Sequence, residues 1–235
     1  MLKVELHCHS DIDPSDIIPY STRGLIDHAA RLGFHALAIT PHDKHFDPTA
    51  DAEYARNMGI TLIAGIERTV HGKHVLLLNF PAACAQVQTF DDIAALKAAH
   101  PKGLVVAPHA FFPNPSALRG KRMDKHAALF DAVEINALYT RVIDFNARAV
   151  RWAKEHGVPL VGNSDLHTLD HLGRTYSLVD AEPYADAICE AIRRGRVEVR
   201  TTPVSHLQAT WTFGRMLVSG GLGILRRVCG RGAAV

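Results

Sequence analysis

Histidine and carboxylate residues recur along this chain where short apolar runs begin or end. In chain order they are His7, His9, His42, Glu67, His74, His109, Asp165 and His167. His7 and His9 are two residues apart, as are Asp165 and His167, so each pair faces one side of an extended strand. A single polar residue at a strand end is ordinary. These eight residues fall at six predicted strands and include two spaced pairs, which indicates one shared site.

Imidazole and carboxylate ligands suit Zn²⁺, Mn²⁺ or Fe rather than Cu(I). The set is larger than one tetrahedral zinc requires, so we expect two or three divalent metal ions. Such a cluster most readily performs hydrolysis, in which a metal-bound hydroxide attacks a polarised ester.

Strands and helices alternate in the pattern that must position these residues. Apolar, β-branched runs predict strands at 4–8, 36–40, 61–67, 74–80, 103–109, 132–136, 159–165, 175–181 and 197–201. Amphipathic patterns predict helices at 21–33, 89–100, 142–157 and 184–195. This alternation predicts an α/β fold of parallel βαβ units, with the polar residues at the carboxyl ends of the strands. Between Glu67 and His74 the connection is too short for a helical crossover, which favours a hairpin that brings the two together.

Composition excludes several classes of protein. The 235 residues are 47% hydrophobic and carry a formal net charge of +2, as in a globular protein without the basic excess of a duplex-DNA reader. The chain shows no apolar signal region after its first residues, and its four cysteines form no C-x-x-C pair. We therefore expect a cytoplasmic protein with no transmembrane segment.

We expect one metal-dependent hydrolase domain over residues 1–204. The segment 205–235 changes character, with an apolar stretch interrupted by glycines and followed by arginines. Its helical pattern predicts a docked terminal helix, and an oligomer contact or a membrane-surface helix are the alternatives.

Five ordered motifs resemble those of the polymerase and histidinol phosphatase (PHP) family of metal-dependent phosphoesterases. LHCHS resembles H-x-H-S, AITPHD resembles I-T-D-H, and AGIE resembles G-x-E. APHA is similar to P-H-x, and GNSDLH is similar to G-S-D-x-H. The resemblance covers about residues 3–180.

The resemblance implies a distorted seven-stranded β/α (TIM-like) barrel with a trinuclear metal centre. By this resemblance His7, His9, Glu67 and Asp165 would hold one metal, and Glu67 would bridge to a second that is also held by His74 and His109. Asp16, His42 and His167 would hold the third. A hydroxide that bridges the metals would be the nucleophile.

The chain departs from the family pattern at two positions. Pro14 stands where the family has an aspartate ligand; the nearby PSD favours Asp16 for that role, and Asp13 is the alternative. Pro41 replaces the aspartate of T-D-H, so the role of that aspartate is lost or passes to Asp43.

Several residues beside the motifs are candidates for supporting roles. Glu134 and Asn136 fall on an acidic strand and would orient metal ligands or serve the structure alone. Arg119 and Arg174 lie closest in sequence to the motifs among the arginines that could bind a substrate phosphate.

These observations lead to one main functional hypothesis. We predict a phosphoesterase that hydrolyses a phosphomonoester, a small nucleotide or a short oligonucleotide. The alternatives are a non-catalytic, metal-stabilised PHP binding module and an amidohydrolase-type metal hydrolase. Against the latter, no lysine takes a bridging position at a strand end, where Glu67 stands instead.

Overall fold

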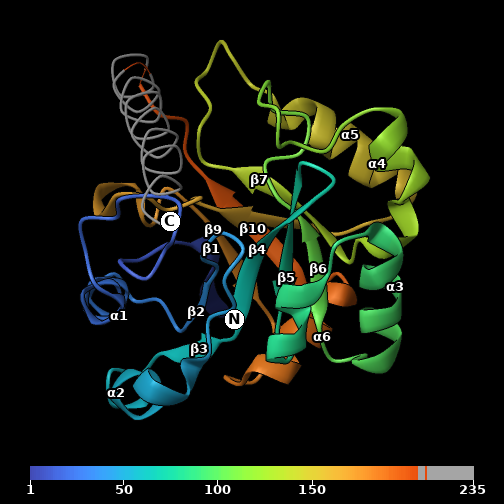
Figure 1. Ribbon diagram of the computed structural model, residues 1–235. Coiled ribbons are helices and arrows are strands. Elements are labelled where there is room, and N and C mark those ends of the chain that lie inside the picture. The colour runs from blue at the N-terminus through green and yellow to red at the C-terminus, as the bar shows by residue number, and fades with distance from the viewer. Residues whose placement is uncertain (206–209, 211–235) are drawn as a thin grey trace, which may run out of the picture.

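The computed structural model describes residues 1–205 and residue 210. Its strands form two five-stranded sheets, with helices packed around them (Figure 1). The fold is α/β, as predicted, but it is not the predicted seven-stranded barrel.

The first sheet has the order β10-β9-β1-β2-β3. Its strands are β1 (Leu2–Cys8), β2 (Ala36–Ile39), β3 (Thr61–Ile63), β9 (Thr175–Val179) and β10 (Val197–Thr201). β1, β2 and β3 run parallel, whereas β9 is antiparallel to both β1 and β10. The sheet is therefore mixed.

The second sheet has the order β4-β5-β6-β7-β8. Its strands are β4 (Gly65–Val70), β5 (Lys73–Leu78), β6 (Leu104–Ala107), β7 (Ala132–Asn136) and β8 (Leu160–Asn163). β4 and β5 form the predicted antiparallel hairpin, in which Thr69 pairs with His74. From β6 to β8 the strands are parallel, so their carboxyl ends meet at one edge.

The barrel prediction is wrong first because the run predicted as one strand at 61–67 is two strands. The strand is interrupted at Ala64, so that β3 is the last strand of the first sheet and β4 is the first strand of the second. Only isolated bridges join the two edges there, between His42 and Glu67 and between Phe46 and Gly65. A Cβ on Gly65 would lie 2.7 Å from the carbonyl oxygen of Ile39, so this close approach requires glycine.

The two sheets also meet at β8 and β9 without forming a ladder. The hydroxyl of Ser177 on β9 accepts from the amide of Gly162 at 2.8 Å and lies 3.1 Å from the Gly162 carbonyl oxygen. A side chain thus takes the place of backbone pairing, which leaves the sheets separate here as well.

The helices lie where the amphipathic patterns predicted them, with two additions. α1 (Thr22–Arg31), α3 (Phe90–Ala99), α5 (Asn146–His156) and α6 (Ala185–Arg193) match the predicted ranges to within a few residues. Ser21 caps α1, and Thr89 with Asp92 forms a capping box at the start of α3. The additions are the short helices α2 (Ala52–Asn57) and α4 (Lys121–Lys125).

Apolar side chains of both sheets pack against these helices. One core cluster lies between the second sheet and α3 and α5, and it includes Val105, Ile93 and Trp152. The predicted tail at 205–235 lies outside the described residues apart from Ser205 and Thr210. Within the described part of the chain, no helix combines the length and the apolar character needed to cross a membrane.

Candidate metal centre

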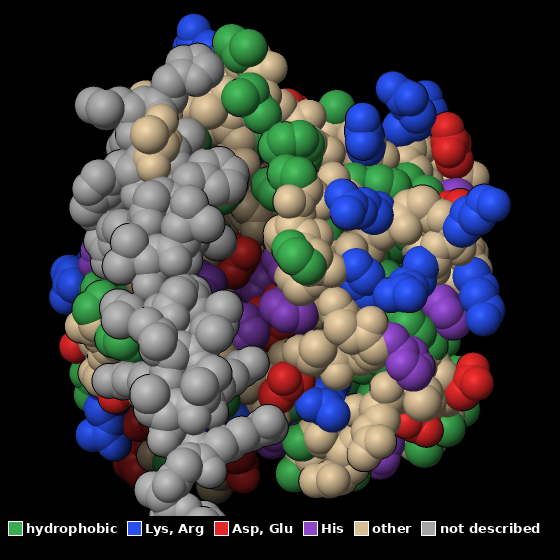
Figure 2. All heavy atoms as spheres, turned by 45° about the horizontal axis from the view of Figure 1, so that its top comes forward, with side chains coloured by type: hydrophobic (Ala, Val, Ile, Leu, Met, Phe, Trp, Pro, Cys, Tyr) green, Lys and Arg blue, Asp and Glu red, His purple; other side chains and the backbone are tan. Residues whose placement is uncertain are grey.

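The strand ends bring all eight of the recurring histidines and carboxylates to one side of the molecule. His7 and His9 come from the end of β1, and Glu67 and His74 come from the hairpin β4–β5. Loops directly after strands supply the others: His42 after β2, His109 after β6, and Asp165 with His167 after β8. In Figure 2, His and acidic side chains gather in a recess near the middle of the face shown.

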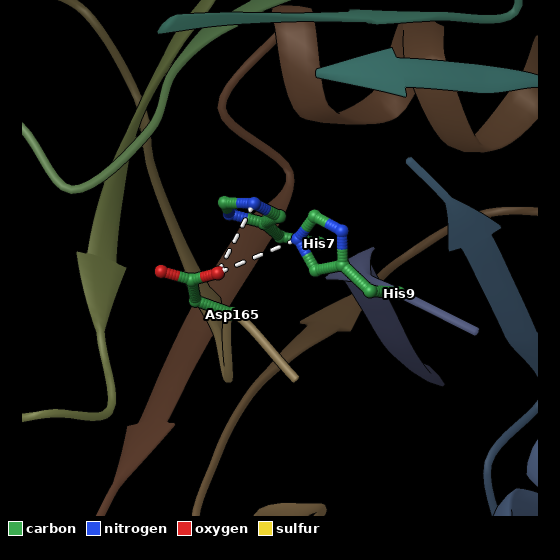
Figure 3. A group of neighbouring side chains, drawn as sticks. All are labelled: His7, His9 and Asp165. Atoms are coloured by element: carbon green, nitrogen blue, oxygen red, sulfur yellow. Dashed lines mark ion pairs between the residues drawn. The ribbon is translucent and has the colours of Figure 1, made fainter. Parts of the chain in front are cut away.

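His7 and His9 point toward the same carboxylate oxygen of Asp165, as Figure 3 shows. The Nε2 atoms lie 3.4 Å (His7) and 3.6 Å (His9) from Asp165 Oδ1, and they stand at the same two distances from Glu67 Oε2. Both Nε2 atoms are buried and have no hydrogen-bond partner among the described residues. Two imidazoles and two carboxylates therefore face one shared point.

Glu67 is the common neighbour of the remaining histidines. Its Oε1 lies 2.6 Å from His74 Nδ1 and 3.0 Å from His109 Nε2, while its Oε2 lies 3.0 Å from His42 Nε2. The carboxylate is 1% exposed, and five imidazoles surround it. The two oxygens of Glu67 therefore contact different imidazoles.

Asp13 and Asp16 occupy different places. Asp13 Oδ2 lies 2.8 Å from His9 Nδ1 and 3.0 Å from His42 Nδ1, and Asp13 Oδ1 accepts from the amides of Ser15 and Asp16. Asp16 Oδ2 lies 3.0 Å from His167 Nε2 and 3.7 Å from His42 Nδ1. Asp13 therefore contacts Nδ1 of His9, the ring nitrogen that points away from Asp165 and Glu67, whereas Asp16 contacts His167.

The carboxylate of Asp43, the other candidate for the role of the aspartate that Pro41 replaces, contacts Arg68 and Thr69 and not a histidine of the cluster. This carboxylate accepts hydrogen bonds from the Arg68 guanidinium at 2.6 Å and from the amide of Thr69 at 2.7 Å. It thereby connects the loop after β2 to β4. Asp13 instead makes the contact to His42 Nδ1.

A buried polar layer lies behind these side chains. Glu134 on β7 is fully buried; its Oε2 lies 2.8 Å from His7 Nδ1, and its Oε1 accepts from the His109 amide at 3.0 Å. The side-chain amides of Asn136 and Asn163 donate to the same carboxylate. Glu134 and Asn136 thus contact the cluster, as the sequence suggested.

Two members of this layer were missed from the sequence. Glu5 is fully buried on β1 and accepts from the amides of His7 and Ser164. The side-chain oxygen of Asn163 accepts from the amide of Leu6 at 3.1 Å, which ties β8 to β1. A charged residue inside the apolar run VELHC was the available signal for Glu5, since an unpaired carboxylate is costly to bury.

The backbone is strained at two of the converging residues. His109 has a φ of 32° and Asp165 a φ of 50°, in a region that residues with a Cβ rarely occupy. Such strain concentrates at functional sites, where the surrounding structure holds the side chain in place.

Charges within the cluster depend strongly on one another. Burial raises the pKa of Glu67, but nearby His74, His7 and His42 outweigh burial and lower that pKa well below its ordinary value. Burial lowers the pKa of His7, yet the charges of Asp165, Glu134 and Glu67 raise it well above its ordinary value. These buried carboxylates therefore require positive charge beside them.

The donor set fits divalent metal ions. Ligands about 2 Å from an ion stand on the order of 3 Å from one another, close to the separations between the His7 and His9 Nε2 atoms and their carboxylate oxygens. Three groups have possible ligand atoms within 4.8 Å of one another: His7 with His9 and Asp165, His9 with Asp13 and His42, and His42 with Glu67 and His74. A cation would satisfy the two unpartnered nitrogens and offset the carboxylate charge.

The two predicted phosphate-binding arginines make no ion pair with the clustered carboxylates in the part of the chain that the structure describes. Arg119 is exposed and acts electrostatically on Lys73, beside Arg122. Arg174 keeps its Nε buried without a hydrogen-bond partner among the described residues. Their role in binding phosphate therefore stays a prediction.

Comparison with known proteins places this geometry in context. A family model described as PHP-associated matches residues 144–197. A two-domain protein from Bacteroides vulgatus, which contains a predicted PHP-like metal-dependent phosphoesterase, is similar in structure, with a TM-score of 0.66 and 21% identity. That match covers 85% of this chain and 64% of the other, so the chain spans less than two thirds of that protein's length.

These matches agree with the predicted resemblance to PHP proteins. PsfC from Pseudomonas syringae is also similar, with a TM-score of 0.59, 18% identity, and coverage of 97% of this chain and 98% of that one. A lesion-specific endonuclease from Pyrococcus furiosus has a TM-score of 0.57 at 16% identity, over 84% of this chain and 57% of its own. At these identities the structural likeness concerns the PHP fold. A search of curated proteins finds no match.

Proposed function

We propose that this protein is a metal-dependent hydrolase of phosphate esters. The observation that carries the proposal is the pair of buried, unpartnered Nε2 atoms of His7 and His9, which face Glu67 and Asp165 together. A bound divalent ion supplies Lewis-acid chemistry at such a site, because it activates water and polarises a phosphoryl oxygen. Likeness to a protein with a predicted PHP-like phosphoesterase and to an endonuclease supports the phosphate ester as the substrate class.

The chain's own residues would bind and orient the ions. We propose two or three ions of Zn, Mn or Fe, held by His7, His9, Asp16, His42, Glu67, His74, His109, Asp165 and His167. Glu67 would lie between two of them, since its two oxygens face different histidines. Glu134 would fix the His7 ring through Nδ1, and Asp13 would do the same for His9, so that each presents Nε2.

The substrate itself is proposed as a phosphomonoester, a small nucleotide or a short oligonucleotide. A panel that measures phosphate or nucleotide release by Mn²⁺-loaded protein tests this, with mononucleotides, a nucleotide bisphosphate, histidinol phosphate and short RNA as substrates. We expect turnover of at least one, and loss of that turnover by more than about 100-fold in His9→Ala. Fully metal-loaded protein that turns over none of them would favour a binding module.

A further inference from the structure

A pocket rich in positive charge lies at the tip of the hairpin that carries Glu67 and His74. It has a volume of about 500 Å³, and five of its eight lining residues are basic or imidazole side chains. We call it the basic pocket and define it by those five residues: His71, Lys121, Arg122, Lys125 and His126. In Figure 2, Lys and Arg side chains gather to one side of the recess that holds the histidines and acidic groups.

The elements that form the basic pocket are continuous with the metal centre. His71 lies in the turn between β4 and β5, four residues beyond Glu67 and three before His74. α4 supplies Lys121, Arg122 and Lys125, and its connecting loop begins at His109. The amide of His74 donates to the Ser116 carbonyl at 2.9 Å, which ties that loop to the hairpin. At about 3.3 Å per strand residue, the turn is about 13 Å from Glu67.

The cations around the basic pocket lack partners of opposite charge. None of Lys121, Arg122 and Lys125 lies within ion-pair distance of a carboxylate in the part of the chain that the structure describes, whereas Lys102 and Arg194 on another face do. Burial lowers the pKa of the adjacent Lys73, and the charges of Arg122 and Arg119 lower it further. Asp91 is the one carboxylate among the eight lining residues. Such concentrated positive charge attracts a polyanion.

The half-buried ring of His126 is the flat surface that the pocket offers. Its other face stacks on the buried ring of Phe90, with ring centres 4.0 Å apart and planes 17° apart. A basic groove combined with stacking rings is the arrangement that binds single-stranded nucleic acid without reading its sequence. A small monoester bound at the metal centre would not span the distance of about 13 Å to these groups.

We propose that the basic pocket binds the sugar–phosphate backbone of a single-stranded oligonucleotide whose scissile phosphate lies at the metal centre. This inference rests on the proposed function and narrows its substrate class. At about 3.4 Å per nucleotide along a stacked strand, the separation of about 13 Å corresponds to about four nucleotides. The proposed site therefore holds a strand longer than a dinucleotide.

Binding of a fluorescein-labelled, 12-nucleotide phosphorothioate oligothymidylate to the metal-loaded full chain tests the proposal without turnover. We compare the wild type, the pair Lys121→Gln/Lys125→Gln, and the matched pair Arg31→Gln/Arg56→Gln, which removes two exposed charges from α1 and α2. In about 0.1 M salt we expect the pocket pair to weaken binding at least 10-fold and the control pair less than 2-fold. The slope of log affinity against log salt should fall by about 1.4 in the pocket pair alone.

Equal weakening by both pairs would overturn the proposal, because net charge and not the pocket would then govern binding. Unchanged binding in the pocket pair, or binding to anionic phospholipid vesicles in place of the oligonucleotide, would overturn it too. Phosphate release from small esters by the wild type is measured separately. If the wild type hydrolyses small esters while the pocket pair binds the oligonucleotide normally, this inference fails and the proposed function stands. If no ester is hydrolysed while pocket-dependent binding holds, the proposed function fails instead.

Discussion

Buried carboxylates behind the imidazoles decide which ring nitrogen each histidine presents. Glu134 lies 2.8 Å from His7 Nδ1 and Asp13 lies 2.8 Å from His9 Nδ1, so both Nε2 atoms face the shared point. The carboxylate also raises the basicity of the imidazole it contacts. Metal affinity should therefore depend on residues that do not themselves touch the ion.

Glu134→Gln should weaken metal binding about 10- to 100-fold, because the amide keeps the shape of the carboxylate but loses its charge. Competition with a coloured chelator measures the affinity. Glu198→Gln, on an exposed part of β10, serves as the control and should bind as the wild type does. Wild-type affinity in Glu134→Gln would contradict the role given to this carboxylate.

Glu5 should make the metal-free protein less stable as the pH rises. Burial raises its pKa from 4.5 to about 8, although hydrogen bonds from Ser164 and His7 oppose this shift. The folded state thus holds a proton that the unfolded chain releases, so stability falls between about pH 4.5 and pH 8, by at most about 1.4 kcal/mol per pH unit, and levels above pH 8.

Urea unfolding of wild-type and Glu5→Gln protein at several pH values isolates this effect. Between about pH 4.5 and pH 8 the unfolding free energy of the wild type should fall relative to that of Glu5→Gln. Above pH 8 the difference between the two proteins should stay constant. A pH-independent difference would show that Glu5 ionises as it does in the unfolded chain.

The clustered residues were predictable from the sequence because histidines and carboxylates recur at strand ends with fixed spacing. The supporting residues were harder to predict. Glu134 and Asn136 stood out on a strand, but Glu5 and Asn163 act across two sheets, and no local pattern shows which backbone amides a buried side chain will reach. The choice between Asp13 and Asp16 likewise depended on the loop's conformation.

The hairpin β4–β5 depends on the close approach of β4 to the end of β2. Gly65 permits this approach, and two residues later Glu67 reaches His42 at 3.0 Å. Backbone hydrogen bonds from Phe46 to Gly65 and from Asp43 to Glu67 fix the position. The geometry of Glu67 therefore depends on a residue without a side chain.

Gly65→Ala should destabilise the protein by about 1–3 kcal/mol and weaken metal binding, since its Cβ would meet the Ile39 carbonyl and the Thr40 methyl. Thermal unfolding and chelator competition measure the two effects. Gly24→Ala is the control, because its Cβ meets only the Ser21 hydroxyl at 3.4 Å and alanine favours the helix. If both variants unfold alike, the close approach is not needed.

Element positions followed from sequence patterns where an element is long and periodic. The ranges of α1 and α3 matched their amphipathic patterns, and the hairpin followed from a connection too short for a helix. α2 and α4 have six and five residues, too few for a periodic pattern to emerge. The break at Ala64 has no sequence signal, since the apolar run continues through it.

The molecule as a whole is two mixed sheets joined by isolated backbone bridges and side-chain hydrogen bonds, where a barrel would have continuous backbone ladders. Ser177 bridges β8 and β9 through Gly162, and Glu5 joins β1 to the chain after β8. Strand alternation predicts an α/β fold but does not distinguish closure from two sheets, because closure depends on ladder contacts at two edges. That is why the barrel prediction failed while the strand ends still converged.

Ser177→Ala should lower the free energy of unfolding by about 1–3 kcal/mol, because the buried amide of Gly162 loses its acceptor. Urea unfolding measures the change. Ser116→Ala, whose hydroxyl contacts Asn114 near the surface, should change stability by less than about 0.5 kcal/mol. Equal effects would mean that the Ser177 bridge does not hold the sheets together.

Elemental analysis of the purified protein tests the central claim, a multinuclear metal centre, most directly. We predict two or three equivalents of Zn, Mn or Fe in the wild type, and a clear loss in Asp165→Ala, which removes the carboxylate shared by His7 and His9. Circular dichroism confirms that both proteins are folded. Folded wild-type protein that holds no metal after incubation with each ion and desalting would contradict the account.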